Sequence, residues 1–271
     1  MSRNGQRRPP EQAGPTVPIF PIAPTVTALF IGDFPMPRGH ALPTHRHTSH
    51  QLAWPARGLL RIRTDLGSWL LPPSLALWIP AGVAHAPESE GDAVLGSLYL
   101  RPERCPASTS WQAPTVLTAD PLLRALLDHL IRDDLAPEAR ARAEDVLFDV
   151  LSPVPVTDVS APEPKDVRAR GVARALAANP ADGRALSAWG SGVGASARTL
   201  ARLFATETGL SFGQWRRRLR MRAAMPLLAE GLPLEAVARR VGYASASSFA
   251  AAFHEVVGLT PRQYFPLGGE G

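Results

Sequence analysis

Histidines gather in one stretch of the N-terminal half of this 271-residue chain. His45 and His47 are separated by one residue, so on an extended strand both side chains point to the same side. Gln51 follows four residues later, and His85 follows a Pro-Ala-Gly turn at residues 80–82. Three neutral imidazoles that converge could bind a divalent metal, with Gln51 as a weak fourth ligand.

The sequence leaves three interpretations of this histidine group open. The rings bind a divalent metal, they hydrogen-bond a small effector without metal, or they are core groups satisfied by their neighbours. No Ser-His-Asp set, phosphate-binding glycine loop or pair of catalytic carboxylates stands out beside them. The sequence therefore gives no independent sign of an enzyme active site.

Positive charge concentrates in the C-terminal part of the chain. Residues 1–164 hold 14 Arg and 17 Asp or Glu, whereas residues 165–271 hold 15 Lys or Arg and 7 Asp or Glu. All but one of those 15 cations are arginine, the side chain suited to bidentate contacts with phosphate and guanine. This asymmetry indicates a nucleic-acid partner for the C-terminal part alone.

The last 90 residues contain an internal repeat. Residues 186–194 align with 234–242 and, after a one-residue insertion, 196–204 align with 245–253. In each copy a short helix precedes a glycine suited to a helix C-terminus, and a serine then stands where a second helix needs an N-cap. This layout is typical of a helix-turn-helix. Two copies on a basic domain favour DNA binding over a helix face that is merely solvated.

A long amphipathic helix is predicted between the two copies, beginning after Ser211 and reaching Met225. An arginine run covers the side opposite its apolar residues. We expect three of these arginines to contact DNA phosphates: Arg216, Arg217 and Arg218. Pro226 should kink or end the helix, because proline removes a backbone donor and clashes with the preceding turn.

Four stretches of this region resemble the DNA-binding domain of the AraC/XylS family of bacterial transcription regulators. They are Ser-Ala-Arg-Thr-Leu-Ala-Arg-Leu-Phe at 196–204, Glu-Thr-Gly-Leu-Ser-Phe at 207–212, Gly-Tyr-Ala-Ser-Ala-Ser-Ser-Phe at 242–249 and Gly-Leu-Thr-Pro-Arg-Gln-Tyr at 258–264. The match covers about residues 168–266. In that family two recognition helices enter successive major grooves of double-stranded DNA.

The resemblance implies which side chains face the bases. In the first recognition helix they are Arg198, Ala201 and Arg202, and in the second they are Ala246, Ser247, Ser248, Ala251 and His254. Serine and alanine offer few hydrogen bonds, so we expect the first helix to supply most of the base readout. Gly190 and Gly192 should soften the helix before it, since each costs about 0.5–1 kcal/mol relative to Ala.

The N-terminal part is predicted to form short strands followed by helices. Gly/Pro turns separate strands predicted at 26–31, 51–54, 59–64, 69–71, 75–79 and 94–100, a pattern that favours a small barrel or jelly roll. Helices are predicted at 120–131, with Asp120 as N-cap and Pro121 in the first turn, and at 137–151.

The histidine spacing resembles the two motifs of the cupin superfamily. In cupins the first motif has Glu where this chain has Gln51, and the second motif is Pro-x-Gly-x-x-His, as at residues 80–85. The missing anionic ligand argues against a redox metal. A cupin before an AraC-type domain is a familiar regulator layout, in which the cupin senses a small molecule or dimerises. The alternative is a metal-dependent cupin enzyme, which the two helix-turn-helix units disfavour.

We therefore expect an α+β chain of two domains: an N-terminal cupin-like β-barrel with following helices, and a C-terminal all-α tandem helix-turn-helix domain. The predicted segments are a disordered arm (1–15), a cupin-like effector or dimerisation domain (16–151), a Pro-rich linker (152–164) and an AraC-type DNA-binding domain (165–271).

The expected function is sequence-specific DNA binding that regulates transcription in response to a small effector, without enzymatic activity. Expected partners are double-stranded DNA, an unidentified small molecule, a second copy of the chain and, for an activator, RNA polymerase. The one possible cofactor is a divalent metal on His45, His47 and His85. A single cysteine, Cys105, and the lack of a signal peptide or an 18-residue apolar run predict a cytoplasmic protein that contacts no membrane.

Overall fold

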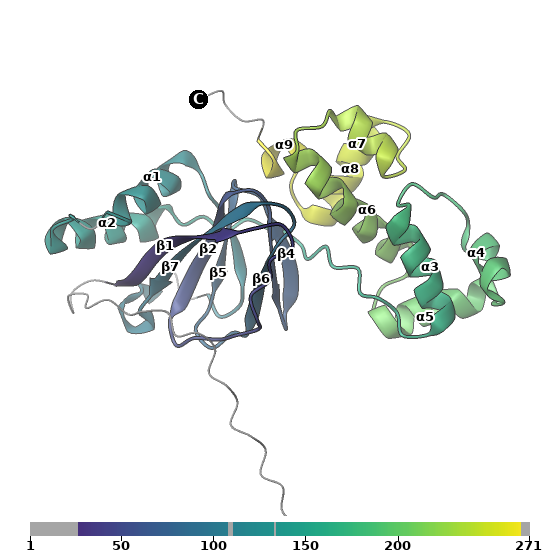
Figure 1. Cartoon of the computed structure of the whole chain (residues 1–271), viewed down its shortest axis with the longest axis horizontal. Coiled ribbons are helices and arrows are strands. Elements are labelled where there is room, and N and C mark those ends of the chain that lie inside the picture. Colours follow the sequence, from purple (N-terminus) through teal and green to yellow (C-terminus); the bar gives the residue numbers. More distant parts are fainter. Residues whose placement is uncertain (1–26, 108–110, 133, 267–271) are drawn as a thin grey trace, which may run out of the picture.

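The structure, a computed structural model, describes residues 27–107, 111–132 and 134–266. The arm predicted at residues 1–15 lies outside the described residues. Figure 1 shows a β-domain with two helices on one side of it and the helical C-terminal region on the other. In this described part of the chain, no helix is both long and apolar enough to cross a membrane.

Eight described strands form two antiparallel sheets that pack against each other. The five-stranded sheet has the order β1-β7-β2-β5-β8, and the three-stranded sheet has the order β4-β3-β6. The strands are β1 (Ala28–Met36), β2 (His50–Arg57), β3 (Leu60–Thr64), β4 (Gly67–Leu71), β5 (Leu75–Ile79), β6 (His85–Ser89), β7 (Ala93–Leu100) and β8 (Thr115–Thr118). The predicted β-rich N-terminal domain is confirmed.

Alternation along β5 separates the two faces of the larger sheet. Leu75, Leu77 and Ile79 pack towards the smaller sheet, inside the barrel. Ala76 and Trp78 point the other way, into a second core that the helices after β8 cover. Because both faces are buried, the strand is an uninterrupted apolar run rather than an alternating one.

The sequence pattern does not predict β6 or β8. The β6 segment contains Pro87 and only small or polar neighbours, and it lies at the edge of its sheet, where a missing backbone donor is tolerated. The predicted helices are confirmed as α1 (Pro121–Leu130) and α2 (Pro137–Val150). Asp120 caps α1, because its carboxylate accepts the Leu123 backbone N–H at 2.8 Å.

The C-terminal region is all-helical, as predicted. Its helices are α3 (Val167–Ala178), α4 (Leu186–Val193), α5 (Ala197–Thr208), α6 (Phe212–Ala229), α7 (Leu234–Arg240), α8 (Ala246–Val257) and α9 (Pro261–Tyr264). We call α4 with α5 the first unit and α7 with α8 the second unit. Each unit turns at a glycine with positive φ, Gly194 at 65° and Gly242 at 84°, and each second helix has a serine N-cap.

Pro226 does not end the linking helix, contrary to one of the two outcomes predicted for it. The helix α6 continues to Ala229, and Pro226 lies in its last turn and a half. Proline lacks a backbone N–H but keeps its carbonyl, and the Pro226 carbonyl accepts the backbone N–H of Glu230 at 3.0 Å, so the helical hydrogen bonding continues past it. The proline therefore costs α6 a single backbone donor near its end.

The Pro-rich linker, residues 152–164, contacts every part of the molecule that it joins. The Val154 N–H donates to the Val116 carbonyl of β8 at 2.9 Å, and the Thr157 N–H donates to the Val257 carbonyl of α8 at 3.0 Å. Farther along, the Pro162 carbonyl accepts the indole N–H of Trp215 in α6 at 2.8 Å. These bonds fix the path of the linker between the sheet and the helices.

The second unit packs on the barrel, whereas the first unit does not share its core. One cluster of buried side chains runs from inside the barrel to Val237, Phe249 and Tyr264. The buried Tyr264 hydroxyl donates to the Leu70 carbonyl of β4, and the Ser74 hydroxyl donates to the Tyr264 carbonyl. In Figure 1, α4 and α5 lie at the end of the molecule away from the barrel.

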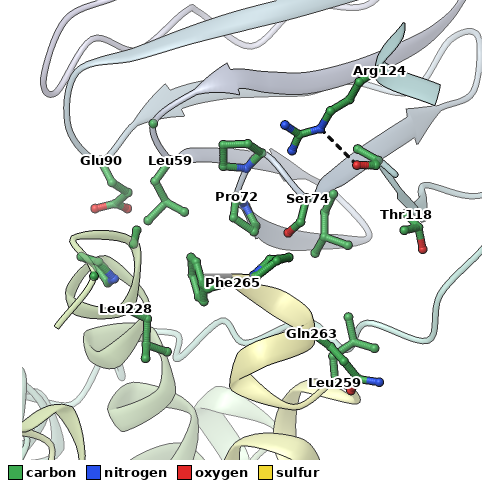
Figure 2. Close-up of a pocket in the computed structure, with 18 of the residues that line it drawn as sticks. Leu59, Pro72, Ser74, Glu90, Thr118, Arg124, Leu228, Leu259, Gln263 and Phe265 are labelled. Carbon is green, nitrogen blue, oxygen red and sulfur yellow. Dashed lines mark hydrogen bonds between the residues drawn. The ribbon is translucent and has the colours of Figure 1, made fainter. Parts of the chain in front are cut away.

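A groove of about 1400 Å³ lies beside this contact (Figure 2). Leu59, Pro72 and Ser74 line it from the barrel side, and Leu228 of α6 and Phe265 after α9 line it from the helical side. The groove thus follows the boundary between the two parts of the chain.

Candidate functional site: a DNA-binding face and a histidine cluster

The helix α5 presents the predicted base-facing residues on its exposed side. Arg198, Ala201 and Arg202 are exposed, while Leu200 and Phe204 on the opposite side are fully buried. Arg198 and Arg202 are four residues apart and so lie on one face. Among the described residues, neither guanidinium has an ion pair or a hydrogen bond to another side chain. This face carries two cations that are available to an outside partner.

The corresponding face of α8 is much less polar. Ser247, Ala251 and His254 are exposed and Ala246 is half-buried. Ser248 is exposed too, but its hydroxyl belongs to the capping box of the helix: it donates to the Ser245 carbonyl at 2.9 Å and accepts the Ser245 N–H. Ser247 and His254 are therefore the hydrogen-bonding side chains that this face can offer without losing its cap.

The three arginines predicted to contact phosphates do not share one face of α6. Arg216 donates to the Arg184 carbonyl at 3.0 Å, beside the first unit. Arg217 pairs with Glu255 of α8 at 2.7 Å. Arg218 turns to the linker, where it lies 3.4 Å from the Ser160 carbonyl and 3.9 Å from an Asp158 oxygen.

Arg220, which the pattern places in the same run, joins the two units. Its guanidinium donates to the carbonyls of Pro180 at 2.9 Å and Gly242 at 3.1 Å, with Asp182 at 3.4 Å. The Pro180 and Asp182 carbonyls belong to the segment before α4, and the Gly242 carbonyl lies in the turn of the second unit. The sequence could not predict this role, because every residue carries a backbone carbonyl and so no residue type marks the partners of Arg220.

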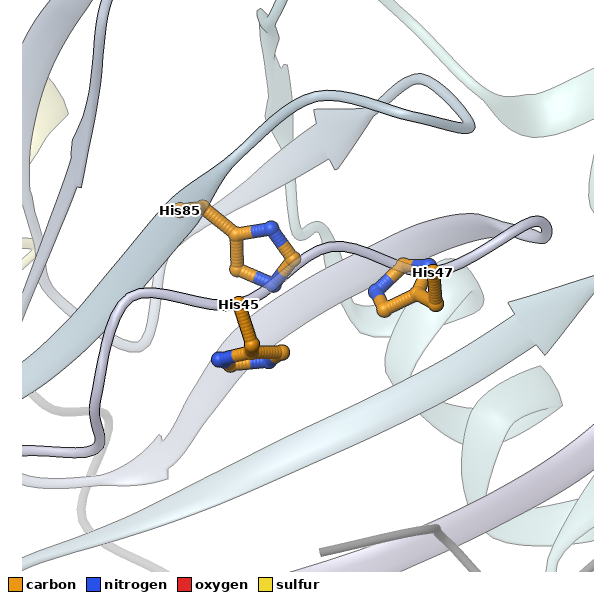
Figure 3. A group of neighbouring side chains, drawn as sticks. All are labelled: His45, His47 and His85. Carbon is orange, nitrogen blue, oxygen red and sulfur yellow. The ribbon is translucent and has the colours of Figure 1, made fainter. Parts of the chain in front are cut away.

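The structure brings the three predicted histidines together at one end of the barrel (Figure 3). The ring centres of His45 and His85 are 4.3 Å apart, those of His47 and His85 are 5.0 Å apart, and those of His45 and His47 are 6.1 Å apart. A ligand nitrogen from each ring lies within 4.8 Å of the other two. His85 is buried, and His45 and His47 are half-buried.

Backbone carbonyls orient all three rings in the same way. The Nδ1 atoms of His45, His47 and His85 lie 2.8, 2.8 and 3.0 Å from the carbonyls of Pro43, Ser49 and Val83. A carbonyl only accepts, so each Nδ1 carries the proton and each Nε2 keeps its lone pair. The Nε2 of His85 is buried and has no hydrogen-bond partner among the described residues.

Burial favours the neutral form of two of these rings. It lowers the pKa of His47 below its ordinary value and lowers the pKa of His85 to about 4. Neutral imidazole with Nδ1 bonded to a carbonyl is the form in which histidine binds metals. An orphaned buried Nε2 beside two similar rings therefore fits a divalent cation better than a core group satisfied by its neighbours.

Gln51 completes the cluster from β2. Its carboxamide oxygen lies 3.1 Å from His47 Nε2, and its amide nitrogen donates to Ser97 Oγ at 2.8 Å. Tyr99 lies beside them, with its ring 5.0 Å from that of His47. Sequence reasoning missed Ser97 and Tyr99. The available signal was their alternate spacing on β7, which pairs Tyr99 with Gln51 across the sheet.

His50, next to Gln51 in sequence, does not belong to the cluster. It begins β2, its ring stacks 4.9 Å from Trp78, and its Nδ1 accepts the Ala81 N–H at 3.0 Å. Successive strand residues point to opposite faces, so His50 lies outside the barrel while Gln51 points into it.

Two family models match separate parts of this chain. Residues 29–151 match the family model described as "AraC-like ligand binding domain", and residues 189–266 match the one described as "Helix-turn-helix domain". Among solved structures, ToxT from Vibrio cholerae aligns with 88% of this chain and 98% of its own, at 11% identity and a TM-score of 0.37.

Two curated relatives are similar over most of the chain. The HTH-type transcriptional regulator NimR of Escherichia coli K12 is 32% identical over 225 residues, which are 82% of this chain and 81% of NimR. The HTH-type transcriptional regulator RipA of Corynebacterium glutamicum is 32% identical over 204 residues, 69% of this chain and 60% of RipA. Both are regulators, which confirms the prediction of a regulator rather than a cupin enzyme. The chain belongs to the AraC family of transcriptional regulators, which bind DNA through a helix-turn-helix region and carry a ligand-binding domain.

Proposed function

We propose that this regulator reads its DNA site mainly through α5. The observation that carries this proposal is the pair of exposed arginines, Arg198 and Arg202, on one face of that helix, neither of which has an ion pair within the described part of the chain. Arginine can bind guanine O6 and N7 with two parallel hydrogen bonds. Ala201 between them lets the helix backbone come close to the groove. Arg216, beside the first unit, and Arg217, beside α8, contact phosphates, whereas Arg218 binds the linker.

The second recognition helix lies in the neighbouring major groove and turns a small, mostly apolar face to the bases. Its residues are Ala246, Ser247, Ser248, Ala251 and His254. Small side chains permit close approach, and an alanine methyl can contact the methyl group of thymine. We infer that this helix contributes shape and position more than hydrogen-bonded readout.

Fluorescence anisotropy on the DNA upstream of the gene and its neighbours tests the proposal. The full chain should bind one of these duplexes more tightly than a scrambled duplex of the same composition, across a series of salt concentrations. Binding that follows salt alone, with no preference for any duplex, would reflect phosphate contacts only and would count against base readout by α5.

The ligand-binding domain receives its signal at the histidine cluster. His45, His47 and His85 have the orientation to hold a divalent metal, with Gln51 beside them, and the other use of these rings is to hydrogen-bond an effector directly. Metal analysis of protein purified without chelator separates the two. About one divalent ion per chain, lost on His85→Asn and kept on His40→Asn, supports the metal. A fully folded, metal-free protein supports direct effector binding.

The active form is a homodimer, joined through the helices that cover the barrel. Leu122 of α1 and Val146 of α2 are apolar yet 53% and 43% exposed, and both helices lie away from the DNA-binding units. Sedimentation of the full chain tests this: Leu122→Glu should shift the equilibrium towards monomer, while Leu66→Glu, at an exposed leucine of the β3–β4 turn, should not. For an activator, RNA polymerase is the further partner.

A further inference from the structure

We propose that the histidine end of the barrel is a receptor for a small anion, which binds through a divalent cation held by His45, His47 and His85. The proposal rests on the proposed function, in the case where the histidine cluster holds a metal, and it names the chemical class of the effector that this regulator binds. Three features of the described residues carry it: the convergent lone pairs, the neutral side chain at position 51 and the hydrogen-bonding groups next to it.

The first step concerns the place for a cation. Gln51 Oε1 and His47 Nε2 are both acceptors, because His47 already donates through Nδ1. They nevertheless face each other at 3.1 Å. Two ligands with bonds of about 2.1 Å to one metal ion lie roughly 3.0–3.4 Å apart. The separation of these two acceptors thus already suits a shared cation. The ligand nitrogens of the other two rings lie within 4.8 Å and would move closer to join them.

The second step is the charge that remains. In the described part of the chain, the candidate metal-binding cluster contains three histidines and no carboxylate. Gln51 can supply an oxygen but no negative charge. A divalent cation held by three neutral imidazoles and one amide therefore keeps both of its charges. Such a centre prefers an anion at its next coordination position, just as a bound metal favours deprotonation of its ligands.

The third step is the environment of that position. Ser97 is buried and fixes the Gln51 amide at 2.8 Å, which keeps the carboxamide oxygen turned towards His47. The Gln51 amide nitrogen also lies 3.4 Å from the Tyr99 hydroxyl, and the Tyr99 ring lies beside that of His47. His45 and His47 are half-buried, so the cluster can be reached from solvent. The site therefore combines positive charge with a hydroxyl donor, which suits a small carboxylate or a similar monoanion.

Cobalt substitution with azide as the probe anion tests the proposal. The full-length chain is loaded with Co²⁺, and its visible absorption is followed as sodium azide replaces sodium chloride at constant ionic strength. We expect one Co²⁺ per chain and a saturable change in the Co²⁺ bands. Q51E supplies the missing charge, so it should bind Co²⁺ about tenfold more tightly and bind azide correspondingly less. Asn179→Asp, which adds the same charge on the exposed end of α3, should change neither affinity.

Tyr99→Phe provides a second variant that keeps the ring in place. Removal of the hydroxyl should weaken azide binding by roughly five- to tenfold, the effect of one hydrogen bond, and leave Co²⁺ affinity unchanged. Co²⁺ bands that do not respond to azide in the parent protein would overturn the anion receptor and leave the metal site standing. Failure to bind Co²⁺ would overturn both, whereas DNA binding, measured separately by anisotropy, decides the regulator function itself.

Discussion

The two helix-turn-helix units share one sequence pattern but have different neighbours. The first unit packs with α3 and part of α6 around a core of its own, which includes Trp189, Phe204 and Trp215. The second unit continues the core of the barrel and is joined to it by the hydrogen bonds of Tyr264. The boundary between the sensing and DNA-binding parts therefore does not coincide with the boundary between packed cores.

This difference indicates how a signal reaches each recognition helix. A change in the barrel acts on α8 directly, through a shared core. It reaches α5 less directly, through α6, through the carbonyl contacts of Arg220, and through the end of the linker, where the Lys165 and Asp166 N–H groups donate to Glu207 of α5. We therefore expect the sensor to set the position of the less polar α8, and the arginine-bearing α5 to supply most of the hydrogen bonds to DNA. An effector that tilts one unit relative to the other changes DNA affinity without touching a base contact.

The largest expected effect comes from removing the residue that joins the second unit to the barrel. Tyr264→Ala should cost about 3–5 kcal/mol of folding free energy, as for other large buried side chains. Phe204→Ala, in the core of the first unit, should cost a similar amount. Hydrogen exchange followed by mass spectrometry separates the two: Tyr264→Ala should raise exchange in β4, β5 and α8 together, whereas Phe204→Ala should raise it in α3 to α5.

Tyr264→Phe is the matched control for this pair. It keeps the ring and removes the hydroxyl that donates to Leu70, so its cost should be about 1 kcal/mol. Equal increases in exchange across both units for both alanine variants would contradict the separation of the cores.

The next effect in size concerns the two recognition faces. Arg202→Ala should weaken specific DNA binding by about 1–3 kcal/mol and relax the preference at one base position. Ser247→Ala, on the second face, should change binding by less than about 0.5 kcal/mol. Anisotropy with a set of duplexes that vary one position at a time measures both. A Ser247 effect equal to that of Arg202 would remove the asymmetry between the helices.

Local signals predicted much of this fold. Asp120 followed by proline marks the start of α1, and the serine N-caps and glycine turns locate both units, because caps and turns depend on residues close in sequence. Contacts between distant segments had no such signal. Nothing near Tyr264 points to Leu70, which is 194 positions away. The same limit hid Tyr99 from the histidine motifs, although the motifs themselves placed His45, His47 and His85 together.

The smallest effect distinguishes two glycines in α4, both of which were expected to soften that helix. A side chain at Gly192 would meet open space, so Gly192→Ala should stabilise the first unit by about 0.5–1 kcal/mol. A methyl at Gly190 would collide with the backbone oxygen of Ala195, whose own N–H donates to the Gly190 carbonyl at 2.9 Å. Gly190→Ala should therefore destabilise by about 1–3 kcal/mol, because a backbone group cannot move aside as a flexible side chain can. Thermal unfolding of both variants checks the signs. The second unit has Ala238 at the position aligned with Gly190. Opposite signs for the two variants would therefore indicate that the need for glycine at this helix position is confined to the first unit.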